Sequence, residues 1–223
     1  MKHQPFENYV LVEGAIVAQP ANRPDPEPTT AYFLVKRFVD VAVSLLLLPV
    51  LFVSAIVLLF VNPRRNKGPL FFVQTRMGQD CEPFQAIKFR SMTVADEIAR
   101  GVNDPLETDR ITPLGNWLRR TRIDELPQVL NVLKGDMSLI GPRPDYFEHA
   151  KVLVDTIPGY RERHNVIPGI SGYAQTEVGY ADSSELIRDK VKADAHYIEN
   201  RSVALEAWIF WRTILTVVSR KGA

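Results

Sequence analysis

The sequence predicts an α+β protein that is mainly helical and carries one small β-hairpin and one long apolar helix. Three observations support this class. Residues Val41–Val61 are uncharged throughout. Two apolar runs, Leu70–Arg76 and Phe84–Arg90, are typical of strands and are joined across Gly78. Apolar residues recur at helical spacing in most of the later segments, which predicts short packed helices.

The composition excludes several classes of protein. A chain of 223 residues can bury one good core. Its net charge of +1 argues against a protein that coats nucleic acid. The single cysteine, Cys81, provides neither a disulfide framework nor a cysteine zinc site, and the four histidines lack a ligand spacing such as HExxH. We therefore expect neither a nucleic-acid partner nor a metal site built from cysteine or histidine.

Residues 1–31 are predicted to form a flexible N-terminal lead. Two short apolar pieces, Tyr9–Val12 and Ala15–Ala18, are separated by Glu13 and Gly14, and a proline-rich run follows. A signal peptide would need a longer uninterrupted apolar centre and a clearer basic start.

The apolar segment Val41–Val61 predicts a membrane-inserted helix. As a straight helix it would rise roughly 30 Å, which is enough to cross a hydrocarbon core. It has no polar face, so a buried helix of a soluble domain is disfavoured. Pro49 lies in its middle and is expected to bend it. Basic residues flank both ends: Lys36, Arg37, Arg64, Arg65 and Lys67.

Two membrane arrangements fit this segment. Because positive charge favours the cytoplasmic side, charge on both flanks suits a bent helix that enters and leaves by the same face. The alternative is a single span with the N-terminus outside. The residues alone leave both arrangements open.

The predicted hairpin presents two cations. Lys88 and Arg90 would project from the same face of the second strand, because strand side chains alternate. Such a pair can bind phosphate, or it can form an ordinary solvated rim. Further on, Thr93 and Asp96 are spaced as a capping pair for a helix that ends near Gly101.

The stretch Ile111–Asp145 contains the candidate catalytic residues. Three arginines precede the adjacent carboxylates Asp124 and Glu125. Asp124 is predicted to be the N-cap of a short helix that ends at Gly135. A helix N-terminus flanked by arginines favours a phosphate-bearing ligand. The alternative is structural, because N-cap aspartates and Arg–Asp pairs at helix ends are common. A Gly-Pro-Arg-Pro corner with Arg143 at its centre follows.

The rest of the chain predicts further helices and one loop. Tyr146–Ile157 is expected to be helical, and the loop Pro168–Tyr173 is either turn chemistry or a ligand wall. Asp182 and Glu185 make a capping pair for the next helix. Ser202–Val218 is rich in large apolar residues, so it packs into the core or lies at the lipid headgroup level. Its aromatic residues and the cations that follow favour the second, interfacial position.

Several motifs together resemble the bacterial sugar transferase family, the monotopic phosphoglycosyl transferases. The resemblance covers roughly residues 32–219 in unbroken order, and separate motifs at consistent distances are more specific than any one of them. The matching segments are Lys36–Asp40, Lys88–Met92, Asp124–Gln128, Gly141–Pro144, Arg163–His164, Pro168–Gly172 and Ala174–Gln175. The departures from the family pattern are Leu48 before the bending proline, Thr176–Gly179, and Glu206 where aspartate is common.

The resemblance implies a reaction and a location. The reaction is transfer of a sugar-1-phosphate from a UDP-sugar to polyprenyl (undecaprenyl) phosphate, at the cytoplasmic face of the bacterial inner membrane. The resemblance also implies that the membrane helix is re-entrant and bends at Pro49. The chain would then comprise a lead, 1–31, a re-entrant membrane helix, 32–63, and a cytoplasmic catalytic domain, 64–223. Membrane lipid is thus an expected partner, and homo-oligomerisation stays open.

The resemblance also implies roles for residues. Asp124 is the expected nucleophile, with Mg²⁺ as cofactor held by carboxylate and phosphate oxygens. Glu125 either holds the metal or positions Asp124. Arg143, with a proline on each side, is the first choice for a phosphate clamp, and Lys88 and Arg90 are the second choices. Two displacements would keep the two anionic substrates from meeting directly.

Two other readings compete with this one. A non-catalytic, membrane-tethered scaffold or regulator would bind nucleotide sugar without turnover, but it would not need Asp124, Glu125 and Arg143 together. A UDP-sugar hydrolase would have little need for the apolar segment Val41–Val61.

Overall fold

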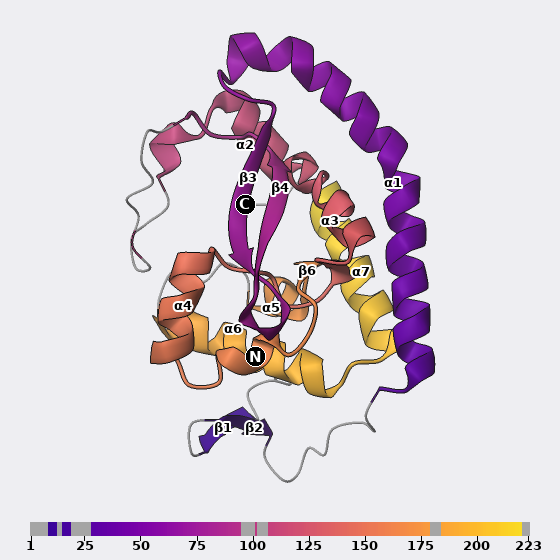
Figure 1. The fold of residues 1–223 in the computed structure, drawn as a ribbon, viewed down its shortest axis with the longest axis vertical. Helices are drawn as coiled ribbons and strands as arrows, with labels where there is room; N and C mark the ends of the chain where they lie inside the picture. The colour runs from indigo at the N-terminus through magenta and orange to yellow at the C-terminus, as the bar shows by residue number, and fades with distance from the viewer. Residues whose placement is uncertain are drawn as a thin grey trace.

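A computed structural model gives the structure of the chain. It describes residues 9–12, 15–18, 28–94, 101, 107–178 and 184–219. The fold is mainly helical α+β, with one long apolar helix near the N-terminus, as the sequence predicts (Figure 1). The predicted capping residues Asp96 and Asp182 lie outside the described residues.

Helices dominate the described part of the chain. The α-helices are α1 Thr30–Arg65, α2 Pro113–Arg120, α3 Gln128–Lys134, α4 Phe147–Thr156, α5 Tyr173–Glu177, α6 Ser184–Glu199 and α7 Val203–Val218. The 3-10 helices are η2 Gln79–Cys81, η3 Thr108–Arg110, η4 Ile123–Glu125 and η5 Arg161–His164. The strands are β1 Tyr9–Val12, β2 Ala15–Ala18, β3 Phe71–Met77, β4 Pro83–Phe89, β5 Ser138–Ile140 and β6 Gly169–Ser171.

The strands pair two by two. Strands β3 and β4 form the predicted antiparallel hairpin, with Phe72 opposite Lys88. Strands β1 and β2 also pair antiparallel, with Val10 opposite Val17. These two strands lie within the lead that the sequence predicts to be flexible, so part of that lead has regular structure. Aliphatic and β-branched residues, which favour strands, make up most of both pieces.

Helix α1 is one continuous helix that passes through Pro49 and curves along one side of the molecule (Figure 1). The Oγ1 of Thr29 caps it by accepting a bond from the Tyr32 amide at 3.3 Å. By length and composition it is apolar enough to cross a membrane. One face is buried against the protein, whereas large apolar side chains such as Phe52 and Phe60 are exposed on the rest of its surface. Its re-entrant path through lipid stays a prediction.

Polar contacts fix the first half of α1 to the domain. The Lys36 ammonium lies 2.7 Å from Oε2 of Glu206 on α7 and donates to the carbonyl oxygen of Ile140 at 2.8 Å. Asp40 Oδ1 accepts a bond from the Leu139 amide at 2.9 Å. Helix α1 is therefore tied directly to strand β5, which leads into the Gly-Pro-Arg-Pro corner.

An apolar cluster fixes the second half of α1. Its buried members come from α1, β4, α2 and α3: Leu51, Leu58, Phe89, Leu118 and Val129. Burial of these side chains removes apolar surface from water, which is the main stabilising contribution in such a core. The apolar helix thus packs along α2 and α3, the two helices that flank the candidate catalytic residues.

Helix α7 has both a buried and an exposed side. Ile209 is fully buried in a cluster with residues of β5, α5 and α6. Trp208, Phe210 and Trp211 are all exposed. The helix therefore contributes to the core and also presents aromatic surface, and its interfacial position stays a prediction.

Candidate active site

Glu125 lies at the centre of a group of cations. Its Oε1 accepts a bond from the Lys88 ammonium at 2.8 Å, and Arg143 donates to both carboxylate oxygens. The Arg122 guanidinium lies 3.6 Å from Oε2. Burial alone would raise the pKa of Glu125, but the charges of Arg143 and Lys88 hold this pKa well below its ordinary value. Glu125 is therefore a firmly ionised carboxylate.

Asp124 is about as buried as Glu125, but cations do not surround its carboxylate at contact distance as they surround that of Glu125. Only 7% of its surface is exposed, and its Oδ1 is buried with no hydrogen-bond partner among the described residues. Burial, followed by the adjacent charge of Glu125, raises the pKa of Asp124 to about 6 despite the nearby cations. Two neighbouring carboxylates with opposed pKa shifts are a pattern typical of catalytic sites.

The local backbone differs from the sequence prediction. Asp124 is not the N-cap of the next helix, and that prediction was wrong. It lies in the 3-10 turn η4, which is closed by a bond from the Leu126 amide to the Ile123 carbonyl oxygen at 3.1 Å. Helix α3 begins at Gln128, with Pro127 at its N-cap. Its predicted end at Gly135 is confirmed, with φ at 99°.

Arg143 reaches Glu125 from the Gly-Pro-Arg-Pro corner between β5 and α4. Besides contacting Glu125, its Nη1 donates to the carbonyl oxygen of Ile170 at 3.1 Å. The corner lies against β6, where the backbones approach very closely. A Cβ added at Gly169 would lie 2.1 Å from the Gly141 amide nitrogen. Gly169 therefore allows the backbone of this loop to pack closely against the backbone of the corner.

The side chains of Lys88 and Arg90 have different partners: Lys88 contacts Glu125, whereas Arg90 contacts the Pro69 carbonyl oxygen. Lys88 is partly buried beside Glu125, and burial lowers the pKa of its ammonium to about 8 against the raising effect of the Glu125 charge. Strand β4 ends at Phe89, so Arg90 does not continue the alternation of the strand. Its Nε donates to the Pro69 carbonyl oxygen at 2.9 Å, and its guanidinium lies over the Phe72 ring. A phosphate-binding role for either residue stays a prediction.

Comparison with known proteins adds to this geometry. The model of the bacterial sugar transferase family matches residues 31–220, which is most of the chain. The chain belongs to this family.

Named relatives of this chain come from several bacteria. It is 39% identical over 197 residues to a UDP-N-acetylgalactosamine-undecaprenyl-phosphate N-acetylgalactosaminephosphotransferase of Aeromonas hydrophila, covering 88% of this chain and 46% of the relative. It is 40% identical over 200 residues to a UDP-glucose:undecaprenyl-phosphate glucose-1-phosphate transferase of Escherichia coli, covering 85% and 41%. A protein of the same name from Caulobacter vibrioides is 37% identical over 204 residues, covering 89% and 75%. The chain thus spans less than half of the first two relatives.

The donor set limits how this chain would hold a magnesium ion. No group of three or more histidine, cysteine or acidic side chains gathers in the described part of the chain. Both oxygens of Glu125 contact cations, whereas Oδ1 of Asp124 is unpartnered there. Mg²⁺ commonly binds through one or two carboxylates plus substrate phosphates. The residues therefore fit a metal held by Asp124 together with a substrate, with Glu125 occupied by cations.

Sequence reasoning did not assign two residues that complete the surroundings of Asp124 and Glu125. Arg122 lies three residues before Glu125 and is held with φ at 58°, which turns the chain into η4. Arg119 is among the cations that lower the pKa of Asp124. Both belong to the basic run noted in the sequence, and the spacing of three between Arg122 and Glu125 was the available signal.

Proposed function

We propose that this chain transfers a sugar-1-phosphate from a UDP-sugar to undecaprenyl phosphate, with Asp124 as the covalent nucleophile and UMP as the first product. The observation that carries this proposal is the contrast between the two carboxylates. Glu125 is neutralised by cations, whereas Asp124 keeps an unpartnered buried oxygen beside the same cations. The names of the relatives, which specify UDP-sugars and undecaprenyl phosphate, support the substrate classes.

In the first displacement, a carboxylate oxygen of Asp124 attacks the sugar-bearing phosphorus of the donor. The bond between that phosphorus and the bridging oxygen breaks, and its electron pair leaves with UMP. In the second displacement, a phosphate oxygen of undecaprenyl phosphate attacks the phosphorus of the aspartyl-phosphosugar. The bond to Asp124 breaks and the carboxylate is restored. Each step has one anionic acceptor at a time, which limits charge repulsion.

The cations around Glu125 have a distinct task in this reaction. A carboxylate repels a diphosphate unless positive charge lies between them. Arg143 and Lys88 are held in place by Glu125, and a guanidinium can pair bidentately with phosphate oxygens. When bound by Asp124 and substrate, Mg²⁺ would supply further positive charge on the phosphate oxygens. Glu125 thus serves in this proposal to position the cations.

The packing of α1 gives the apolar helix a chemical purpose. Arg37 on α1 donates to the carbonyl oxygens of Val132 at 2.7 Å and Leu133 at 3.0 Å, at the end of α3. Helix α3 begins three residues after Glu125, so the helix that faces lipid and the catalytic turn belong to one packed unit. This supports a site held at a fixed depth beside the headgroups of the inner membrane, on the cytoplasmic face.

Isotope exchange tests the proposal directly. Purified protein in mixed micelles is given a UDP-sugar from a panel and labelled UMP, without lipid acceptor. The two-displacement reaction predicts that label enters the UDP-sugar, and that Asp124→Asn abolishes this exchange. Asp155→Asn, which changes an exposed carboxylate on α4, is the matched control. Exchange that survives in Asp124→Asn would show that another residue is the nucleophile.

The same experiment separates the competing functions. A non-catalytic scaffold binds the donor but shows neither exchange nor UMP release when undecaprenyl phosphate is added. A hydrolase releases UMP and sugar phosphate without any lipid acceptor. Only the transferase forms a lipid-linked sugar diphosphate.

A further inference from the structure

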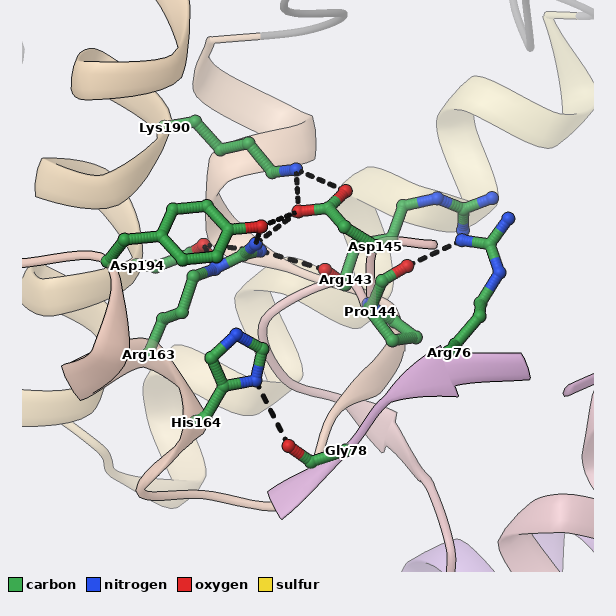
Figure 2. Close-up of polar contacts among 10 residues, drawn as sticks. Arg76, Gly78, Arg143, Pro144, Asp145, Arg163, His164, Lys190 and Asp194 are labelled. Atoms are coloured by element: carbon green, nitrogen blue, oxygen red, sulfur yellow. Dashed lines mark hydrogen bonds and ion pairs between the residues drawn. The ribbon is translucent and has the colours of Figure 1, made fainter. Parts of the chain in front are cut away.

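The Gly-Pro-Arg-Pro corner is held by its carbonyl oxygens. Pro142 and Pro144 have no amide hydrogen, so the corner cannot form a regular ladder of its own. The carbonyl oxygens of its last three residues, Pro142 to Pro144, and that of Asp145, which follows, instead each accept a bond from a distant residue, and two of these bonds are drawn in Figure 2. The donors, in order, are the Gly169 amide at 2.9 Å, Arg163 Nη2 at 2.8 Å, Arg76 Nη1, and the Met77 amide at 3.1 Å.

Arg163 holds Arg143, the first choice for the phosphate clamp. Its Nη2 donates to the main-chain oxygen of Arg143, whose own guanidinium contacts Glu125. Proline on each side limits how far the Arg143 backbone can rotate. The main chain of Arg143 is the fixed point from which its side chain reaches Glu125 and Ile170, and Arg163 holds this main chain from outside the corner.

The guanidinium of Arg163 is itself fixed on its other edges. Its Nε donates to Oδ2 of Asp194 at 2.9 Å, and its Nη1 contacts Asp145. Asp194 lies on α6 and is completely buried, and only 2% of Arg163 is exposed. Figure 2 shows Arg163 between these carboxylates, with Lys190 on the far side of Asp145. A planar guanidinium that is held on two edges presents its remaining donor in a fixed direction.

We propose that Arg163 is a positioning residue for the transfer reaction: through the Arg143 carbonyl oxygen it sets the Arg143 guanidinium on Glu125 and toward the donor diphosphate. This inference rests on the proposed function for its catalytic consequence. The mechanical part of the proposal, that Arg163 immobilises the corner, does not depend on which reaction the protein catalyses.

Arg163→Lys is the first variant. It keeps the positive charge beside Asp194 and Asp145, but an ammonium cannot also reach the Arg143 carbonyl oxygen with the geometry of a guanidinium. Arg161→Lys is the matched control, because Arg161 lies in the same 3-10 turn and is exposed. If Arg163→Lys does not fold, the pair Arg163→Met/Asp194→Leu replaces it, since apolar residues of similar volume often substitute for a buried ion pair without loss of stability.

Hydrogen–deuterium exchange is the readout that does not depend on activity. We expect faster exchange in a peptide spanning residues 138–147 of Arg163→Lys, and unchanged exchange in a peptide spanning 83–92 from β4. Arg161→Lys should match the wild type in both peptides. Unchanged exchange in 138–147 overturns the proposal, and so does failure of both Arg163 variants to fold, which would assign Arg163 to the stability of the whole domain.

Kinetics of UMP release with undecaprenyl phosphate present then test the catalytic consequence. We expect kcat to fall about 30-fold in Arg163→Lys, because a displacement of about 1 Å in a positioned group has effects of this order. In an Arg143→Lys background, the same change should alter kcat by less than about twofold, since the two residues act as one unit. A full 30-fold loss in both backgrounds overturns the proposal. A wild-type protein without UMP release rejects the proposed function instead, and the exchange measurement still decides the mechanical part.

Discussion

Asp124 and Glu125 are neighbours in sequence and nearly equal in burial, at 7% and 6% exposure, but only Glu125 is surrounded by cations at contact distance. The pKa of Asp124 is raised to about 6, and that of Glu125 is held well below its ordinary value. The difference arises from the 3-10 turn, which points the two side chains into different surroundings. Under the proposed function, Asp124 is the residue that reacts and Glu125 is the residue that positions the cations.

Glu125→Gln tests this division of roles. The substitution leaves the partly buried cations Lys88 and Arg143 without their shared counter-charge, so we expect a loss of about 3 kcal/mol in the free energy of unfolding. The UMP exchange rate should fall at least about 100-fold, because the cations proposed to bind phosphate lose their fixed positions. Thermal unfolding in detergent and isotope exchange measure the two effects. Glu148→Gln, at an exposed position on α4, should change neither.

A buried histidine predicts loss of stability in mild acid. Burial, then the charge of Arg163, lowers the pKa of His164 from 6.5 to about 4, and its Nδ1 lies 3.0 Å from the Gly78 carbonyl oxygen. In the unfolded chain, His164 therefore takes up a proton as the pH falls below 6.5. In the folded chain, it takes up this proton only near pH 4. Stability that is present above pH 6.5 is lost as the pH falls through this window, by about 3 kcal/mol in total.

His164→Asn isolates this effect, because its amide can still donate to Gly78 but does not titrate. The melting temperature of the variant should fall less than that of the wild type between pH 7 and pH 4.5. Parallel decline of both proteins over this range would mean that other groups govern acid sensitivity.

The link between the apolar helix and the catalytic turn is tested by Arg37→Lys. This variant keeps the positive charge but loses the two-pronged contact with the Val132 and Leu133 carbonyl oxygens. We expect the free energy of unfolding to fall by about 2 kcal/mol, the scale of hydrogen bonds from a charged group. Denaturation in micelles provides the measurement, and Arg64→Lys, at the exposed end of α1, is the control. Equal loss in the two variants would argue against a specific clamp.

Gly169→Ala tests the close approach of β6 and the corner. The added Cβ would lie 2.1 Å from the Gly141 amide nitrogen, so backbone must move. We expect a destabilisation of about 3 kcal/mol and loss of exchange activity. Gly135→Ala is the comparison, since its Cβ would meet nothing within 4 Å and only its positive φ is strained. That variant should cost about 1 kcal/mol and retain activity. Similar effects at both glycines would contradict the packing argument.

Local patterns predicted much of the fold. The hairpin was placed to within a residue at each end of its strands, because alternation and the turn at Gly78 are local signals. The end of α3 at Gly135 followed from glycine chemistry in the same way. The start of α3 did not, because a capping aspartate and a 3-10 turn before proline have the same sequence signature. The positive φ of Arg122 favours the 3-10 turn over the capped helix, and no local sequence pattern predicts this φ.

The site was only partly accessible to sequence reasoning. Lys88 and Arg143 were singled out for their charge, and the structure brings both to Glu125. Arg90 was singled out on the same alternation, yet the strand ends one residue before it. Arg163 and its partner Asp194 are 31 residues apart, and only the packing of α6 brings them together. Buried ion pairs of this kind depend on tertiary contacts, which periodicity does not encode.

The most direct test of the central claim is the intact mass of the protein after mixing with a UDP-sugar in the absence of lipid acceptor. The account predicts a mass increase of one sugar phosphate, located by peptide mapping to Asp124, absent from Asp124→Asn and discharged when undecaprenyl phosphate is added. Rapid formation of lipid-linked sugar by a wild-type protein that never carries this adduct would contradict it.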